Sequence, residues 1–368
     1  MKRLLTLSLP LLISATVFGA GITPGDLVIS RVGDGSAALT SAATALFLDE
    51  YTPAGAFVQT IALPTAVSGA NQILAIQGTA SSEGFLQFSG NGSYLTLGGY
   101  NAALGTAAPS GQTAATINRV IGLVNVASGS VDTSTAINTG TSGAFRSVTT
   151  DDGTHFWASS ASAGVGYISS VGASSATQLS TTPANTRVTR AIGGQLFASS
   201  ASGVFQGIST IGTGQPTTSE QTTTLLNGFP TTSGPSSYDF FVSGNIAWVA
   251  DDRTTGVGGV QKWTSDGTTW TLQYTIGRTG VGDRGLTIDP SSLSTTPTFY
   301  VTTTDNKVDV IVDGGTLGSS TDTTAFSDGT ANTTFRGIAF VPSAVPEPST
   351  AAVFGLGLMA WGIIRRRK

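Results

Sequence analysis

The sequence predicts an all-β fold, a β-propeller of about six blades over residues 24–343. Three observations predict it. No stretch between Gly21 and Ser343 keeps a 3.6-residue apolar period, which argues against long amphipathic helices. Short runs rich in Val, Ile, Phe, Tyr and Thr are instead separated by Gly, Asn, Asp and Ser, the pattern of strands and turns. Strand units recur about 40 to 50 residues apart, the spacing of propeller blades.

Residues 1–20, ahead of this body, are predicted to be a secretory signal peptide. Lys2 and Arg3 supply positive charge, an apolar run extends from Leu4 to Phe18, and small residues follow. This order is typical of signal peptides. The apolar run is shorter than the roughly 20 residues that a membrane-spanning helix needs. We therefore expect export of the chain and removal of this segment.

The two ends of the body are each predicted to hold part of one blade. Strands are expected at 26–32, 45–49 and 57–61, with no opening strand before them. A last strand is expected at 335–341, with no room for a blade after it. We expect these strands to share one blade, because that closes the ring and hides two unpaired sheet edges.

The other blades are expected to open near residues 83, 145, 186, 237 and 284. Each unit has an apolar strand, a turn with Gly or Asp, and two further strands. Asp-Gly pairs, which favour tight strand reversals, begin at Asp34, Asp152, Asp266, Asp313 and Asp328. The shared blade brings the count to six, although the long interval between 83 and 145 leaves room for a seventh. Two β-sandwiches or a β-solenoid are the alternative arrangements.

The C-terminal segment has three consecutive parts. The motif Val345, Pro346, Glu347 and Pro348 comes first, and an apolar run at 351–364 follows. The chain then ends with Arg365, Arg366, Arg367 and Lys368. As a helix the run is about 21 Å long, which suits a short membrane anchor. The four cations are expected to stop transfer and stay on the cytoplasmic side.

This ending resembles the PEP-CTERM sorting domain of exported bacterial proteins, in which the same three parts occur in this order. The resemblance covers residues 345–368 and implies an exosortase as a partner, a membrane enzyme that cuts near the motif. It also implies transient insertion in the inner membrane, followed by release or transfer to the cell surface. An ordinary C-terminal membrane anchor is the alternative.

Charge excludes one class of partner. Six of the 17 basic residues and one of the 21 acidic residues lie in the two end segments. The body keeps 11 basic and 20 acidic residues, a net charge near −9. Because nucleic acids are held by Lys and Arg, we expect the body not to bind them.

Metal chemistry has few candidates. The chain has no Cys and one His, His155. Asp151 and Asp152, and separately Asp305 and Asp309, could contribute oxygen ligands to Ca²⁺. The plainer interpretation is that they belong to turns, so we expect no cofactor.

Four arginines share one position in the units. Arg146, Arg187, Arg284 and Arg336 each lie within or beside a blade-opening strand. They either surround the central channel, where an anionic ligand could bind, or pack strand ends and pair with Asp. The second is the plainer interpretation.

The expected function is that of a non-catalytic protein of the cell surface or extracellular matrix, associated with exopolysaccharide. The resemblance to PEP-CTERM proteins implies the polysaccharide, because that sorting system is linked to its production. A surface rich in Ser, Thr, Asn and Gly agrees with it. The alternative is a secreted, Ca²⁺-dependent propeller hydrolase or lactonase-like enzyme with oxygen ligands at the channel mouth.

Overall fold

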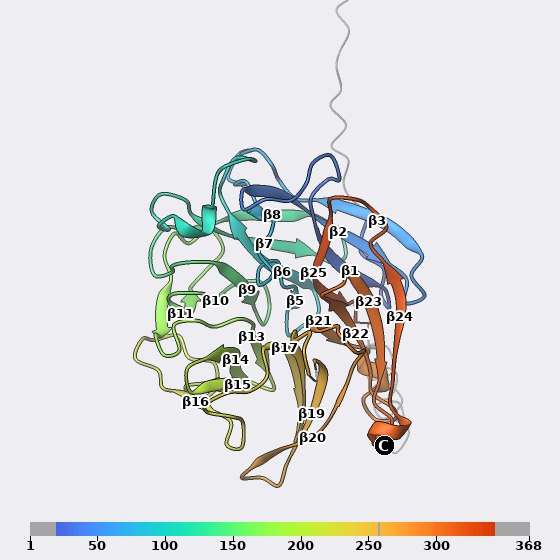
Figure 1. Cartoon of the computed structure of the whole chain (residues 1–368). Coiled ribbons are helices and arrows are strands. Elements are labelled where there is room, and N and C mark those ends of the chain that lie inside the picture. The colour runs from blue at the N-terminus through green and yellow to red at the C-terminus, as the bar shows by residue number, and fades with distance from the viewer. Residues whose placement is uncertain (1–19, 257, 343–368) are drawn as a thin grey trace, which may run out of the picture.

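The two ends of the body pair with each other and close a ring of six four-stranded blades (Figure 1). The computed structural model describes residues 20–256 and 258–342. The predicted signal peptide up to residue 19 and the sorting segment 345–368, with its motif and apolar run, lie outside the described residues. The propeller with a shared closing blade is confirmed.

Blade one contains that closure. Its strand order is β25-β1-β2-β3, all antiparallel, and Ile29 of β1 lies opposite Ile338 of β25. Just beyond the strands, Gly25 and Val341 add backbone hydrogen bonds. The four strands are β25 (Thr334–Phe340), β1 (Leu27–Val32), β2 (Ala43–Tyr51) and β3 (Phe57–Ala62).

Blade two fills the long interval that left room for a seventh blade. Its strands are β5 (Gln87–Phe88), β6 (Tyr94–Tyr100), β7 (Arg119–Asn125) and β8 (Val131–Ile137). Residues between β6 and β7 form a long connection with the 3-10 helix η1 (Pro109–Gly111). A short strand, β4 (Ala75–Gln77), pairs with β2 and β6 and joins the first two blades.

The other four blades are separate sheets whose strands follow one another in sequence. Blade three has β9 (Phe145–Thr149), β10 (Phe156–Ser160), β11 (Gly164–Ile168) and β12 (Thr177–Ser180). Blade four has β13 (Thr189–Ile192), β14 (Gln195–Ser202), β15 (Phe205–Ile211) and β16 (Thr223–Leu225).

Blade five has β17 (Ser237–Ser243), β18 (Ile246–Asp251), β19 (Gly259–Ser265) and β20 (Trp270–Ile276). Blade six has β21 (Asp283–Ile288), β22 (Thr298–Thr303), β23 (Lys307–Val312) and β24 (Thr321–Ser327), with the 3-10 helices η2 (Pro290–Ser292) and η3 (Leu317–Ser319) in its loops. None of the helices in the described part of the chain is long and apolar enough to cross a membrane.

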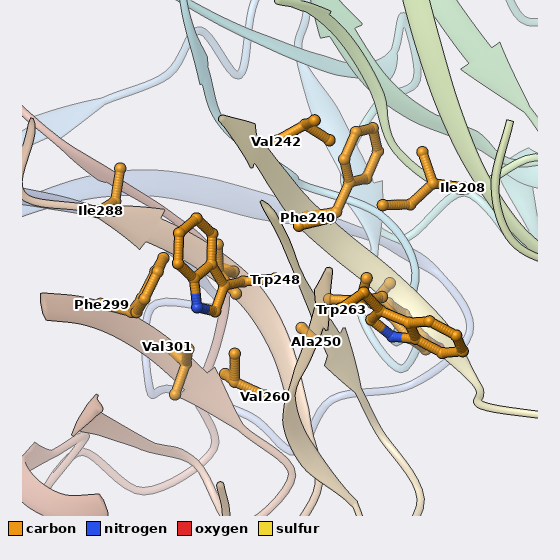
Figure 2. Close-up of a cluster of buried hydrophobic side chains, with 14 of the residues drawn as sticks. Ile208, Phe240, Val242, Trp248, Ala250, Val260, Trp263, Ile288, Phe299 and Val301 are labelled. Atoms are coloured by element: carbon orange, nitrogen blue, oxygen red, sulfur yellow. The ribbon is translucent and has the colours of Figure 1, made fainter. Parts of the chain in front are cut away.

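Apolar side chains pack between adjacent blades and form the core. The interface of blades five and six is the clearest example, with Trp248 of β18 against Phe299 of β22 at a ring-centroid distance of 5.0 Å (Figure 2). Phe240 of β17 extends the same cluster toward Ile208 of blade four. All four side chains are almost completely buried. Burying apolar area between blades is the main stabilising contribution of such a ring.

Buried hydroxyl groups connect neighbouring blades near the axis. Ser199 of β14 accepts a hydrogen bond from the Val188 amide of its own blade and donates one of 2.5 Å to the carbonyl of Tyr238 in the next blade. Similar bridges to the next blade are donated by Ser30, Ser159 and Thr302. These small side chains satisfy backbone groups that would otherwise be buried without a partner.

Candidate functional site

The innermost strands of the six blades surround a central channel and start at the same end of it. At the far end, residues from all six blades line a funnel of about 320 Å³, which we call the channel mouth. In the four blades that have an arginine near the start of the innermost strand, the lining residues come after it: Thr149 comes after Arg146, and Ile338 comes after Arg336. The channel therefore has a mouth with both polar and apolar lining residues at one end, and the innermost strands start at the other end.

Two aromatic side chains close the channel between these ends. Phe85 of blade two and Tyr238 of blade five come from opposite sides of the ring, and their ring centroids are 5.8 Å apart. Both are buried. The Tyr238 hydroxyl lies 3.4 Å from the hydroxyl of Ser81, which also comes from blade two. We call this pair the aromatic plug.

A buried ion pair forms the floor of the mouth. Arg190 of β13 donates two hydrogen bonds, of 2.9 and 3.0 Å, to the carboxylate of Asp239 in β17. It donates another, of 2.8 Å, to the carbonyl of Leu286 in β21. Because Asp239 is fully buried, this bidentate pair fixes blades four, five and six relative to one another.

The four arginines selected from the sequence converge on the other side of the plug. The guanidinium carbons of Arg187 and Arg284 lie 4.0 and 6.0 Å from the centre of the Tyr238 ring. Burial and then repulsion from Arg187 lower the pKa of Arg146, and burial and then repulsion from Arg284 lower that of Arg336. The structure thus brings together side chains from blades one, three, four and six. We call this group the arginine cluster.

Glu83 lies next to the arginine cluster and was not selected from the sequence. It is fully buried, and its carboxylate accepts hydrogen bonds from the Tyr100 hydroxyl (2.7 Å) and the Gln77 amide (2.9 Å). Burial raises its pKa to about 6. In the sequence Glu83 precedes Gly84 in an irregular segment. No local pattern there predicts that the side chain is buried or which residues surround it.

The carboxylates proposed for Ca²⁺ lie in two separate blades. Asp152 caps a turn before β10, accepting from the amide and hydroxyl of Thr154, and lies 3.9 Å from His155. Asp151 accepts a hydrogen bond from Gln215.

In blade six, Arg278 connects the other two carboxylates, Asp305 and Asp309. It contacts Asp305 at 3.1 Å and Asp309 at 2.5 Å, and Lys307 also contacts Asp305. Within residues 20–256 and 258–342, no group of three or more acidic or histidine side chains has an arrangement that could hold a metal ion.

One of the Asp-Gly pairs does more than reverse a strand. Asp313 is buried and accepts hydrogen bonds from Trp248 Nε1 (2.8 Å) and the Tyr274 hydroxyl (2.6 Å). Lys262 forms an ion pair with it at 2.8 Å. These partners hold the pKa of Asp313 below its usual value despite burial. The residue fastens blade six to blade five, a role that its turn sequence did not indicate.

The comparisons with known proteins agree with the sorting segment and the fold. Residues 344–368 match the PEP-CTERM protein-sorting motif, so the chain carries the sorting signal of exported proteins that an exosortase recognises. No curated protein matches the chain.

Solved structures with a similar arrangement include TolB from Acinetobacter baumannii, with a TM-score of 0.50 and 10% identity over 89% of this chain and 69% of that one. A periplasmic gluconolactonase from Pseudomonas aeruginosa has a TM-score of 0.46 and 13% identity over 80% of this chain and 82% of that one. At this identity the likeness concerns the fold alone.

Proposed function

We propose that the protein is exported, anchored briefly in the inner membrane and processed by an exosortase, and then acts at the cell surface as a non-catalytic propeller associated with extracellular polysaccharide. The observation that carries the proposal is the PEP-CTERM motif at residues 344–368. The motif implies export and processing by an exosortase. The body ahead of it forms a closed ring that does not include the motif.

The position of the motif relative to the ring supports processing. Val341 makes the last backbone hydrogen bonds of the closing strand, to Gly25 and Asp26. The motif begins four positions later, at Val345. A cut near Val345–Pro348 therefore leaves β25 and its pairing with β1 complete. The released body keeps every blade.

The surroundings of the polar candidates support a non-catalytic role. Asp151, Asp152, Asp305 and Asp309 each have protein partners in turns or ion pairs. A catalytic Ca²⁺ would need several oxygen ligands to converge. At the channel mouth, the contacts of Arg190 with Asp239 and with the Leu286 carbonyl join blades four, five and six.

Processing is tested by mass spectrometry of the protein made in a host that has an exosortase. We expect the extracellular form to lack Arg365–Lys368. A variant with Pro346, Glu347 and Pro348 replaced by Ala should remain with the membrane fraction, uncut. An extracellular form that retains Arg365–Lys368 would overturn the proposed route.

The non-catalytic role is tested separately on the purified protein, with a glycan-binding array, a Ca²⁺ titration by calorimetry and esterase, lactonase and glycosidase assays. Glycan retention without turnover is the expected result. Micromolar Ca²⁺ affinity together with turnover would favour the secreted hydrolase instead.

A further inference from the structure

The arginine cluster is held in place by the backbone of neighbouring segments. Nη1 of Arg146 donates to the carbonyl of Thr186 at 2.8 Å, and Nη1 of Arg187 donates to the carbonyl of Ser237 at 2.8 Å. Nε of Arg336 donates to the carbonyl of Ala80 at 2.7 Å. Each guanidinium thus reaches across to a neighbouring blade or segment, which fixes its position before any ligand arrives.

Positive charge exceeds negative charge in this group. Four guanidinium groups converge, while the nearby carboxylates are those of Glu83 and Asp252, the latter 3.3 Å from Arg284. Both carboxylate oxygens of Glu83 already accept hydrogen bonds from Tyr100 and Gln77. Most of the bonds that the arginines make go to carbonyl oxygens, which carry no charge to balance them.

This excess of positive charge is unfavourable. Burial, followed by repulsion from Arg284, lowers the pKa of Arg336 to about 10. Burial and repulsion from Arg187 also lower the pKa of Arg146. Among the described residues, Nε of Arg146 has no hydrogen-bond partner although the atom is buried. A buried, unpartnered donor on a cation is the kind of group that an oxyanion satisfies.

Solvent can reach the cluster. Arg146, Arg187 and Arg284 are partly exposed, whereas Arg336 and the Tyr238 ring beneath them are buried. The aromatic plug separates this end from the channel mouth, so a ligand enters from the side where the innermost strands start.

We propose that the arginine cluster, composed of Arg146, Arg187, Arg284 and Arg336 around Tyr238, is a binding site for a single oxyanion group such as a carboxylate or a phosphate. Planar guanidinium groups bind both through paired hydrogen bonds. One part of this proposal rests on the proposed function: that the carboxylate belongs to an acidic sugar of an extracellular polysaccharide. The site itself does not depend on how the protein is sorted.

The test uses the full-length chain purified in detergent and titrated by calorimetry at constant ionic strength. The probes are galacturonate, inorganic phosphate and, as the uncharged control, galactose. We expect binding of one or both anions and none of galactose. Selective binding of galacturonate identifies an acidic sugar as the source, and selective binding of phosphate identifies a phosphate-bearing ligand.

Arg146→Gln should weaken binding of the anion about tenfold or more, because the substitution removes a charged hydrogen-bond donor. Arg146→Lys keeps the charge but loses the paired geometry, so it should recover only part of the affinity. Lys307→Gln is the matched control: it also removes one positive charge, but from the contact with Asp305 in the outer part of blade six, and should bind as the original chain does.

Circular dichroism and melting without ligand show whether each variant is folded; if Arg146→Gln is not, Arg187→Gln takes its place. Absence of binding for both anions would overturn the proposal. Equal losses in Arg146→Gln and Lys307→Gln would overturn it too, because they would show general charge attraction. Neither result bears on exosortase processing, which is measured by the mass of the extracellular form.

Discussion

At the scale of single residues, hydroxyl groups near the axis decide how the blades join. Ser199 is fully buried, and its one hydroxyl serves the Val188 amide and the Tyr238 carbonyl at the same time. A side chain this small fits between two backbones where a longer one would not. The bridge also positions Tyr238, whose ring lies beneath the arginine cluster.

Ser199→Ala should therefore lower the free energy of unfolding by about 1–3 kcal/mol, because two buried backbone groups lose their partner. The measurement is urea unfolding followed by tryptophan fluorescence. Ser202→Ala, at the partly exposed end of the same strand, is the control and should change stability by less than about 0.5 kcal/mol. Equal stability of Ser199→Ala and the original chain would show that the bridge contributes nothing.

Three carboxyl groups of blade six share a buried region, and this makes stability depend on pH. Burial, and after it the negative charge of the neighbouring Asp309, raise the pKa of Asp322 to about 6. Burial likewise raises the pKa of Asp283, which is almost completely buried. Both oxygens of Asp322 are buried without a hydrogen-bond partner among the described residues.

A raised pKa in the folded state means that the favourable contribution of Asp322 is complete below about pH 4 and is lost as the pH rises through 6. Asp322→Asn should accordingly raise the free energy of unfolding at pH 7 by about 2 kcal/mol and change it little at pH 4. Melting temperatures of both chains between pH 4 and 7 test this. A gain of the same size at both values would exclude ionisation as the cause.

At the scale of elements, β25 closes the ring by pairing with β1. It is the innermost strand of a blade whose other strands come from the opposite end of the chain. Phe335, Ile338 and Phe340 of this strand are buried. Without β25, β1 loses its inner neighbour and these apolar contacts disappear.

A chain that ends after residue 333 should melt at least about 10 °C below a chain that ends after residue 342, because it loses a paired strand and its buried side chains. Both chains lack the sorting segment, so the comparison isolates β25. Differential scanning calorimetry gives the two transitions. Coincident melting curves would mean that closure of the ring does not stabilise it.

The outermost strands differ from the inner ones in a way that the sequence shows poorly. β16 and β24 are rich in Thr and have mostly exposed or partly exposed side chains. With little apolar alternation they resemble loops, and the predicted units accordingly had three strands instead of four. Pairing to the strand beside them, rather than burial, makes these segments β-structure.

At the scale of the whole molecule, charge is distributed unevenly. The body carries a net charge near −9, yet four arginines converge at one end of its channel. The overall field repels nucleic acids, whose phosphates are closely spaced, while the local cluster favours one anionic group.

The body should therefore not shift double-stranded DNA in a gel-mobility assay at about 0.15 M salt, where binding would need several phosphate contacts. A protein of known DNA affinity serves as the positive control for the assay. A stable DNA complex at that salt would show that the local cluster outweighs the net charge.

The sequence by itself determined the features that depend on neighbouring residues and on regular spacing. Turn residues and β-branched runs predicted the strands, and the spacing of the strand units predicted about six blades. The last strand at 335–341, which has no room for a blade after it, predicted closure of the ring. The three-part ending at 345–368 predicted the sorting motif. These patterns involve residues that are close in the sequence, so they can be recognised in a single sequence.

Only the tertiary structure decided which distant side chains meet. Arg146 and Arg336 are 190 positions apart, and the sequence left open whether such arginines form a ring or pair with Asp. Phe85 meets Tyr238 across the axis. Asp313, which the sequence predicts as a turn residue, accepts a hydrogen bond from Trp248 and forms an ion pair with Lys262. The Phe85–Tyr238 contact requires the closed ring, which places blades two and five opposite each other, whereas the Asp313 contacts require that blades five and six pack together. The physical reason is that strand and turn preferences act over a few residues, whereas these contacts depend on how the blades pack.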